Sequence, residues 1–357
     1  MVHVRQIWLQ NFRNYDEQQI SFGKGTIIVF GLNGQGKTNL VEAINYLGTA
    51  TSFRGVPVES LIRDGSESAT IRADVLNKKR ELLVEAQISR AARNTISINK
   101  QKISPIRNLI GLIPTTIFGP DDLSLIKEGP AIRRNYIDHL LIQINPNNMK
   151  LRVDLDQVLK QRNALLKNSR GKIGERALNN LEIWNDQFNK LGHEWAKLRK
   201  KTLIQIKNWA NDAYAQLSGT SNEITMCYNP EWDEVGLEKA LFEVRNEEFR
   251  RGTTLVGPHR DEISIGLGNL PARTHASQGE QRTIALALRV AGHHLLSEIH
   301  NTKPVLLLDD VFSELDKYRT DALLQLLIAD QTFITTAVEL TNITSGTQLH
   351  VSNGKIL

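Results

Sequence analysis

The chain has 357 residues with a formal net charge of +5, 40% hydrophobic and 23% charged residues, ordinary values that predict a globular protein of two or three structural units. No stretch reaches 18 uninterrupted apolar residues and the first residues lack the layout of a signal peptide, so we expect no membrane span and a cytoplasmic location. The single Cys227 excludes an internal disulfide, and no Cys/His grouping has zinc spacing, since we interpret His293, His294 and His300 as one helix surface.

The first functional signal along the chain is a strand, a glycine-rich loop and a helix. Short strands are predicted ahead of it, in 2–9 and 19–22. Residues 26–30 are β-branched and apolar like a buried strand, and 39–44 continue as a helix. The loop between them fits the pattern G-x-x-x-x-G-K-[ST]. Its candidate nucleotide-binding residues are Gly31, Leu32, Asn33, Gly34, Gln35, Gly36, Lys37 and Thr38.

This pattern suits a triphosphate because glycines let several backbone N–H groups turn toward one anion. Lys37 is the candidate catalytic cation for the β- and γ-phosphates, and Thr38 offers a hydroxyl to Mg²⁺. ATP and Mg²⁺ are therefore the expected cofactors. The alternative, a glycine-rich turn that binds nothing, leaves the complete motif and both flanking elements unexplained.

After the loop, Gly48 is predicted to end the helix. We interpret Arg54 in the following loop as a nucleotide contact, with an ordinary surface arginine as the alternative. Three segments then alternate with period two between polar turns, which predicts an antiparallel β-meander. These segments are 69–75, 82–88 and 95–98.

Basic residues concentrate in two segments. Residues 78–107 contain eight Lys and Arg against two acidic residues, and residues 187–207 contain six against one. This distribution is typical of a polyanion-binding surface, and solvated loops and helix faces are the alternative. The candidate contacts in the first segment are Lys78, Lys79, Arg80, Arg90, Arg93, Lys100 and Lys102.

The pattern becomes helical after a predicted strand at 113–118. From Asp121 to about Ser218, apolar residues recur every three or four positions, and few Gly or Pro interrupt them. We predict a helical hairpin or small bundle whose aromatic stripe is core rather than a base-stacking platform. The stripe consists of Trp184, Phe188, Leu191, Trp195 and Leu198.

A further helix is predicted to start at Ser277. Ser277 and Glu280 have the S-x-x-E spacing of a capping box. A serine, a glycine and a helix N-terminus are also what the γ-phosphate held by another subunit would need, so both interpretations can hold. The candidate nucleotide contacts here are Ser277, Gly279 and Gln281.

The second half of the site lies at 305–310. Residues 305–308 read as a buried strand that ends in Asp309 and Asp310. In P-loop enzymes such a strand lies beside the phosphate loop, so Asp309 would hold the water shell of Mg²⁺ and Asp310 would polarise the attacking water. Thr38 and Asp309 are therefore the predicted Mg²⁺ residues, and Asp310 joins Lys37 as a predicted catalytic residue.

In this order the motifs resemble those of ABC-type ATPase heads, with a signature motif at 277–281 and a D-loop at 313–316. Within that superfamily the likeness is to the RecF family of bacterial recombination and repair proteins. The segments that carry it are 9–15, 31–38, 52–54, 159–163, 257–261 and 308–316.

The resemblance implies an α/β fold, an ABC-type P-loop ATPase head with an antiparallel β subdomain and an inserted α-helical arm. The head would occupy 1–120 and 245–357, with the β subdomain at 65–105 inside it. The arm would occupy 121–244.

The resemblance also implies a function. Two heads would close on ATP held between one subunit's phosphate loop and the other's signature motif. The basic residues would then contact gapped or single-stranded DNA, with little sequence specificity. RecR would be a partner, and the protein would support RecA loading and the SOS response.

Two departures from the transporter-type pattern bear on turnover. Asp310 replaces the usual catalytic glutamate with a shorter side chain, and 333–336 lack the usual switch histidine. We therefore expect a slow ATPase that acts as a switch and is stimulated by DNA. No glutamine near 118–122 fits a Q-loop.

Two alternatives come from other functional classes. The ATPase subunit of a membrane transporter would not need the helical arm, and a small-molecule P-loop phosphotransferase leaves 277–281 with no purpose beyond capping.

Overall fold

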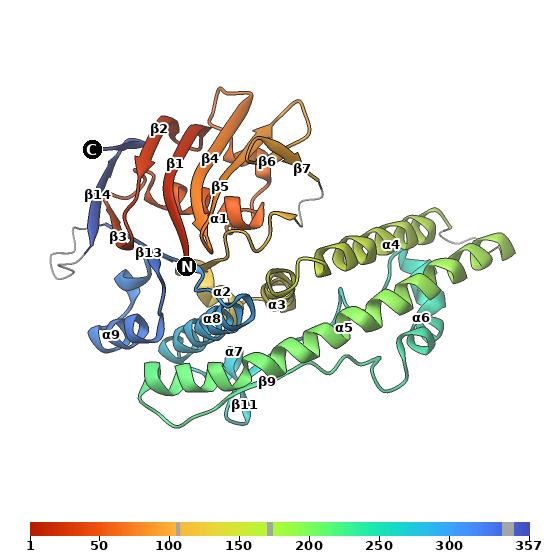
Figure 1. Ribbon diagram of the computed structural model, residues 1–357. Coiled ribbons are helices and arrows are strands. Elements are labelled where there is room, and N and C mark those ends of the chain that lie inside the picture. The colour runs from red at the N-terminus through yellow and green to blue at the C-terminus, as the bar shows by residue number, and fades with distance from the viewer. Residues whose placement is uncertain (105–107, 170–173, 338–345) are drawn as a thin grey trace. The chain divides into compact units, whose positions relative to one another are not determined.

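The computed structural model describes residues 1–104, 108–169, 174–337 and 346–357. The chain forms two compact units (Figure 1). The first unit consists of 1–123, 209–221 and 282–357, and the second consists of 124–208 and 222–281. These units differ in extent from the predicted head and arm, because 245–281 belong to the second unit. The head-and-arm division stays a prediction.

The main sheet of the first unit carries the phosphate loop. Its strands follow the order β15 (Lys355–Ile356), β14 (Thr347–Ser352), β3 (Gly25–Phe30), β13 (Gln331–Thr336), β12 (Val305–Asp309) and β8 (Thr115–Phe118). All neighbours from β14 to β8 are parallel, and β15 is antiparallel to β14. The carboxyl ends of the parallel strands therefore meet at one edge, where open α/β sheets bind ligands.

A second, antiparallel sheet contains the predicted meander. Its order is β2 (Tyr15–Ser21), β1 (Val2–Phe12), β4 (Ser68–Asn77), β5 (Arg80–Ser89), β6 (Thr95–Ile98) and β7 (Gln101–Ile103). The turn between β4 and β5 is only two residues, Lys78 and Lys79, both with positive φ. This is the turn geometry that matches the twist of a tight hairpin.

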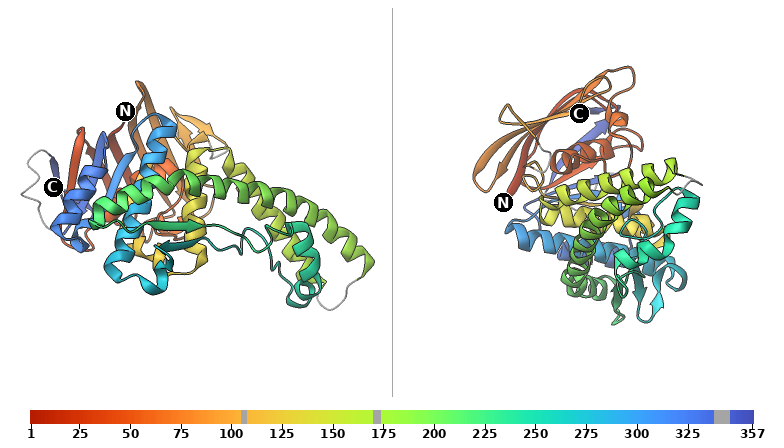
Figure 2. Two further views of the ribbon diagram at one scale, coloured as in Figure 1. Left: turned by 90° about the horizontal axis from the view of Figure 1, so that it is seen from below. Right: turned by 90° about the vertical axis from the view of Figure 1, so that its right-hand side faces the viewer.

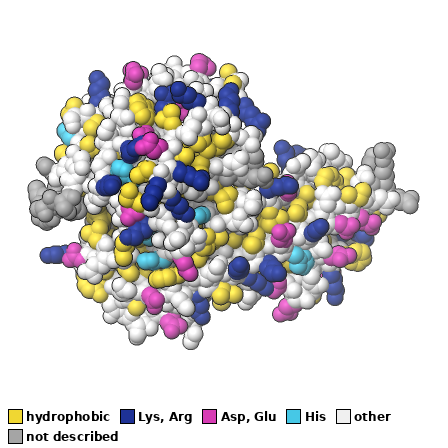
Figure 3. All heavy atoms as spheres, viewed as in Figure 1, with side chains coloured by type: hydrophobic (Ala, Val, Ile, Leu, Met, Phe, Trp, Pro, Cys, Tyr) yellow, Lys and Arg dark blue, Asp and Glu magenta, His cyan; other side chains and the backbone are white. Residues whose placement is uncertain are grey.

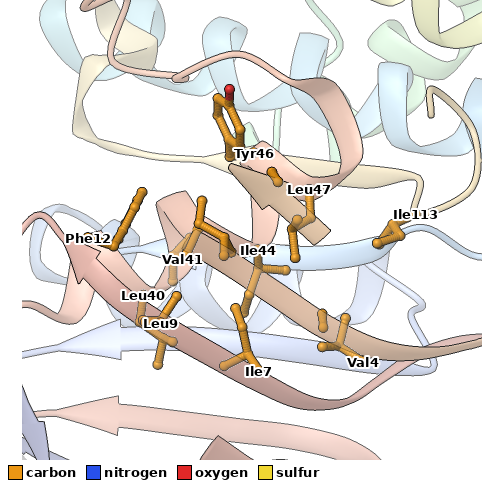
Figure 4. Close-up of a cluster of buried hydrophobic side chains, with 14 of the residues drawn as sticks. Val4, Ile7, Leu9, Phe12, Leu40, Val41, Ile44, Tyr46, Leu47 and Ile113 are labelled. Atoms are coloured by element: carbon orange, nitrogen blue, oxygen red, sulfur yellow. The ribbon is translucent and has the colours of Figure 1, made fainter. Parts of the chain in front are cut away.

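Helix α1 (Lys37–Thr49) contacts strands of both sheets and fills the core between them. Figure 4 shows Leu40, Val41 and Ile44 of α1 beside Ile7 and Leu9 of β1, and all five side chains are buried. The aliphatic burial makes α1 a rigid support for the loop that precedes it.

The predicted end of this helix at Gly48 is wrong. The helix continues to Thr49, and Ala50 adopts the left-handed cap conformation with φ 54°. Gly48 is needed for another reason, since a Cβ there would lie 2.3 Å from the carbonyl oxygen of Ile113.

The second unit is mainly helical, as predicted for the segment after Asp121. Its long helices are α3 (Pro130–Ile144), α4 (Asn148–Asn168), α5 (Glu175–Ser218, with 209–218 in the first unit) and α6 (Leu237–Arg251). Figures 1 and 2 show α6 beside α4 and α5, where Leu166, Leu181 and Phe249 form a buried cluster. A small antiparallel sheet joins β9 (Ile224–Cys227), β10 (Ser264–Leu267) and β11 (Leu270–Pro271).

The remaining elements are short, apart from α8. They are η1 (Val58–Leu61), η3 (Pro120–Leu123), α2 (Ser124–Lys127), α7 (Ala272–His275), α8 (Gln278–His300), η4 (Val311–Glu314) and α9 (Lys317–Leu326). In the described part of the chain, no helix is both long and apolar enough to span a bilayer.

The prediction that the aromatic stripe of α5 is core is confirmed for Phe188 and Trp195, whereas Trp184 is half-buried. Phe188 and Trp195 are fully buried, and the indole N–H of Trp195 donates to Asp138 at 3.1 Å. The prediction that the basic segment 187–207 faces a polyanion is wrong for Arg199. Its guanidinium is fully buried and donates to both carboxylate oxygens of Asp138, at 2.8 and 2.9 Å. It is therefore unavailable to any ligand.

Two of the segments that carry the family resemblance, 159–163 and 257–261, have structural roles in the second unit. Arg162 is fully buried and forms a two-pronged ion pair with buried Glu248, at 2.6 and 3.1 Å. Asp261 accepts hydrogen bonds from Tyr228 and Trp232 at 2.5 and 2.8 Å. Charges buried this deeply are tolerated because each has paired donors and acceptors.

The interpretation of His293 as a helix-surface residue is wrong. Its side chain is 1% exposed, and its ring nitrogens lie 3.1 Å from Thr116 Oγ1 and 3.4 Å from the Ile328 carbonyl oxygen. Burial lowers the pKa of His293 from 6.5 to about 4. His294 is partly buried and stacks on Trp209 with ring centroids 4.6 Å apart.

The low pKa of His293 predicts a stability loss in mild acid. The unfolded chain binds the proton more tightly, so the stabilisation is complete above about pH 6.5 and declines as the pH falls toward 4. Between pH 7 and pH 5, His293 should remove about 2 kcal/mol from the free energy of unfolding. Urea unfolding of His293→Gln should show a shallower pH dependence by that amount, while exposed His275→Gln should match the original chain. An unchanged slope in His293→Gln would contradict the assignment.

Candidate nucleotide-binding site

The loop 31–38 follows β3 and leads into α1, as predicted. Gly31, Gly34 and Gly36 have φ of 147°, 79° and 120°, a region that side chains avoid. A Cβ on Gly31 would lie 2.3 Å from the Val351 carbonyl oxygen, and one on Gly36 would lie 2.7 Å from the Asn14 side chain. The curl of the loop therefore depends on glycine at these positions.

Two segments distant in sequence support this loop. The Asn14 amide donates to the Gln35 carbonyl at 2.7 Å, and the Tyr15 hydroxyl donates to the Gly36 carbonyl at 2.9 Å. On the other side, the turn between β14 and β15 donates from the Gly354 N–H to the same Gln35 carbonyl at 2.9 Å. The loop is thus held in its curled form by hydrogen bonds from neighbouring segments.

Lys37 is folded over this curl. Its ammonium donates to the carbonyls of Gly31 and Leu32, at 2.7 and 2.9 Å. Burial lowers the pKa of Lys37 below its ordinary value, and the charges of Asp310 and Asp309 oppose that shift. The Lys37 side chain is therefore held within the loop by two carbonyl contacts, which an anion could replace.

Thr38 and Asp309, the predicted Mg²⁺ residues, are brought together. Thr38 Oγ1 donates to Asp309 Oδ1 at 2.8 Å, and Thr335 Oγ1 donates to the same oxygen at 2.7 Å. Thr335 also accepts the backbone N–H of Asp310 at 3.0 Å. Burial raises the pKa of Asp309, while the two hydroxyls and the charge of Arg54 lower it. Asp310 itself adopts φ 52°, a left-handed backbone conformation that is uncommon for residues other than glycine and that is found preferentially at functional sites.

The strand that ends in Asp309 lies beside the phosphate loop, as predicted, although it is not the immediate neighbour of β3, the strand that precedes the loop. Strand β13 lies between β3 and β12 and pairs with both. The carboxyl end of β12 nevertheless reaches Thr38 because all three parallel strands end at the same edge. Thr335, at the end of β13, consequently becomes part of the site.

A pocket of about 270 Å³ opens beside these residues. Thr38, Arg54 and Asp309 line it, so Arg54 lies beside the predicted Mg²⁺ residues, and its contact with a nucleotide stays a prediction. Residues 119–122 also line it, and there buried Asp122 accepts from Arg289 at 2.8 Å and from the Gly119 N–H at 3.0 Å. An acid and an arginine therefore occupy the region where a Q-loop glutamine would be expected.

Phosphate oxygens would complete the ligand sets that these residues offer. The glycine-rich loop would offer backbone N–H groups to the phosphates, and Lys37 would offer its ammonium. Thr38 and Asp309 would each offer one oxygen to a cation. Among the described residues, no group of three or more His, Cys, Asp or Glu could hold a metal ion by itself. The residues fit Mg²⁺ bound together with a polyphosphate, the form in which P-loop sites hold it.

The signature segment forms the predicted capping box. Ser277 donates through its N–H and its hydroxyl to Glu280 Oε2, both at 2.8 Å, and the Glu280 N–H donates back at 3.3 Å. Ser277 and Gly279 are exposed at the start of α8. The Gln281 side chain is buried and donates to the carbonyls of Ala272 and Arg273, so in this form it points away from the surface.

The seven predicted polyanion contacts are all exposed, but the strand register separates them. Lys78, Lys79 and Arg80 lie at the end of β5 where Lys100 also lies, because Val84 pairs with Ile98. Lys102 lies on β7 and pairs with Ser97, the second residue pair from the β6–β7 turn. Arg90 and Arg93 lie beyond the opposite end of β5. The ten residues of β5 separate the two ends by roughly 30 Å, at about 3.3 Å per residue.

The face of this sheet is not uniformly basic. Figure 3 shows Lys and Arg side chains interspersed with Asp and Glu on the visible face. Arg5 pairs with Asp74 and Glu81, and Arg72 pairs with Glu85. The ends of the strands therefore offer more uncompensated positive charge than the middle. Arg107, in the same basic segment, lies outside the described residues.

Comparison with known proteins places the whole chain in one group. Residues 3–351 match the family model "RecF/RecN/SMC N terminal domain". The chain is 38% identical to the "DNA replication and repair protein RecF" of Streptomyces avermitilis, with 99% of each chain covered. It is 36% identical to that of Renibacterium salmoninarum, over 95% of this chain and 94% of the relative. A solved structure of "the recombination mediator protein RecF-ATP in RecFOR pathway" superposes with a TM-score of 0.92 at 30% identity, covering 100% and 97% of the two chains.

The position of Thr335 generates a prediction about metal-dependent binding. Thr335→Val keeps the shape but removes the hydroxyl that donates to Asp309 and accepts from Asp310. Leaving these buried groups without their partner should cost about 1–3 kcal/mol and weaken Mg²⁺–nucleotide binding about tenfold. Thr335→Ser keeps the hydroxyl and should bind nearly as the original chain. Titration of a fluorescent ATP analogue with and without Mg²⁺ measures both, and equal affinities for the two variants would contradict the role of the hydroxyl.

Proposed function

This chain belongs to the RecF family of DNA replication and repair proteins, and on that basis we propose that it is an ATP-dependent DNA-binding protein of recombinational repair and replication-fork maintenance. The observation that carries the proposal is the joined site in which Thr38 of the phosphate loop meets Asp309 at the end of β12. In P-loop enzymes a hydroxyl and a carboxylate brought together in this way hold the divalent cation that accompanies a bound polyphosphate.

ATP and Mg²⁺ are the proposed ligands. The loop 31–38 would hold the phosphates, Lys37 would neutralise their charge, and Thr38 with Asp309 would hold Mg²⁺. The related structure named for RecF with ATP supports this choice. When bound, ATP would supply a γ-phosphoryl group that water can attack with ADP as the leaving group, and Asp310 would accept a proton from that water.

ATP is proposed to close a homodimer. Ser277 and Gly279 are exposed at the N-terminus of a 23-residue helix, a position suited to a phosphate presented by a second subunit. Gln281 would have to leave its carbonyl partners to join them. The shorter carboxylate at Asp310 and the absence of a switch histidine from 333–336 favour slow hydrolysis, so the closed form would persist and then release.

The proposed partner of the closed dimer is single-stranded or gapped DNA. The cluster of Lys78, Lys79, Arg80 and Lys100 at one end of the antiparallel sheet would contact phosphates without reading sequence. RecR and the RecA-loading machinery are the proposed protein partners in the cytoplasm, with the SOS response downstream. Membership of the RecF family argues against the transporter subunit and the small-molecule phosphotransferase.

Sedimentation with nucleotide and DNA tests the dimer. The original chain should be a monomer alone or with ADP, and a dimer with ATP that gapped DNA strengthens. Lys37→Met should neither bind ATP nor dimerise. Ser277→Arg should bind ATP as a monomer and fail to close, whereas exposed Ser264→Arg should behave as the original chain. A dimer formed by Ser277→Arg would reduce the signature segment to a helix cap, and a monomer of the original chain in every condition would rule out the proposed closure of a homodimer.

Charge reversal tests the DNA surface. Changing Lys78, Lys79 and Arg80 to Glu should weaken DNA binding more than changing Arg90 and Arg93, because more basic residues gather at the first end. The dependence of log affinity on log salt should become shallower by about 0.7–0.9 for each DNA phosphate that the variant no longer neutralises. Fluorescence anisotropy at several salt concentrations measures both effects. Equal reductions in affinity for the two sets of changes would rule out the cluster as the principal DNA-binding surface.

A further inference from the structure

A buried carboxylate lies behind the site, in a position that the nucleotide chemistry does not use. Glu42 is on α1, just past the phosphate loop, and its side chain is fully buried. Arg13 donates two hydrogen bonds to it, from Nε to Oε2 at 2.9 Å and from Nη2 to Oε1 at 3.0 Å. A charge so deeply buried is retained only where its oxygens are fully engaged.

The same carboxylate holds the loop that carries Arg54. Ser52 is 7% exposed, and its hydroxyl donates to Glu42 Oε1 at 2.5 Å. The Ser52 hydroxyl in turn accepts the backbone N–H of Arg54 at 3.2 Å. At the far side of this loop, Arg13 Nη1 donates to the Ser60 carbonyl at 3.0 Å. The loop is therefore fixed at both ends by one ion pair.

What the loop presents is the guanidinium of Arg54. Arg54 lines the pocket together with Thr38 and Asp309, and its charge acts on the Asp309 carboxylate. The contacts run without a break from Arg13 through Glu42 and Ser52 to the Arg54 backbone. Helix α1, which begins at the phosphate loop, thus also determines the position of Arg54 through Glu42.

We propose that Arg13, Glu42 and Ser52 are positioning residues that hold Arg54 against the terminal phosphate of a bound nucleoside triphosphate. The inference rests on the proposed function, since it specifies how this site tells a triphosphate from a diphosphate. An arginine held in place loses less freedom on binding than one on a free loop, and its charge-assisted hydrogen bond is correspondingly stronger. Only the terminal phosphate gains from it, so affinity for the diphosphate is largely independent of these residues.

A double-mutant cycle tests the chain of contacts. Removing Glu42 or Arg13 would leave the other charge buried and could unfold the protein, so the variants are Ser52→Ala, Arg54→Ala and both together. Ser60→Ala is the matched control, because its exposed hydroxyl in the same loop donates only to the Pro57 carbonyl. Affinities for ATP and ADP are measured by titrating a fluorescent analogue. Thermal unfolding without nucleotide confirms that each variant is folded.

Arg54→Ala should weaken ATP binding about tenfold and ADP binding much less, as expected for one charged hydrogen bond. Ser52→Ala should also weaken ATP binding more than ADP binding, by about half the binding free energy lost in Arg54→Ala, which is about threefold. Adding Ser52→Ala to Arg54→Ala should cause no further loss of ATP affinity. Full additivity, or equal weakening of ATP and ADP binding, would overturn the inference, as would an Arg54→Ala variant that binds ATP normally. Failure of the original chain to bind ATP would instead remove the proposed function.

Discussion

A single hydrogen bond, from Thr38 to Asp309, joins residues 271 positions apart. It fixes the edge of the main sheet at which the carboxyl ends of the parallel strands meet. It can form only if β3, β13 and β12 end in register, because Thr38 follows the first of these strands and Asp309 ends the last. Thr335, which lies opposite Asp309 on the strand between them, donates to the same carboxylate oxygen. The parallel register of the strands and the burial of α1 therefore together determine the geometry of the site.

The parts of the site that are predictable from the sequence are those written in consecutive residues. The loop 31–38, the strand ending at Asp309 and the Ser277 capping box each occupy one short segment whose pattern has a direct geometric meaning. The roles of Asn14, Thr335 and Arg289 are not predictable in this way, because they arise only when distant segments meet. The periodicity of α5 identifies its buried stripe, but cannot show that Arg199 on its flank is buried against Asp138, since that depends on a different helix.

The two units use buried charge in different ways. In the second unit, Arg162 with Glu248 and Arg199 with Asp138 tie helices together through fully engaged ion pairs. In the first, the pair of Arg13 and Glu42 lies behind a site and fixes a loop that faces ligand. Such pairs add little net stability compared with an apolar core, and their directional hydrogen bonds instead restrict which arrangement of the chain is acceptable.

The contact between Gln35 and the turn at 353–354 has a consequence for synthesis on the ribosome. The Asn353 N–H donates to the Gln35 side chain across 318 residues, and the Gly354 N–H donates to the Gln35 carbonyl. At about 5–20 residues per second, the phosphate loop would emerge roughly 15–65 s before its supporting turn is made. Throughout that interval the loop lacks one of the two segments that support it, so a nascent chain would meet cellular nucleotide with an incomplete binding loop and acquire full affinity only after residues 353–354 have been made.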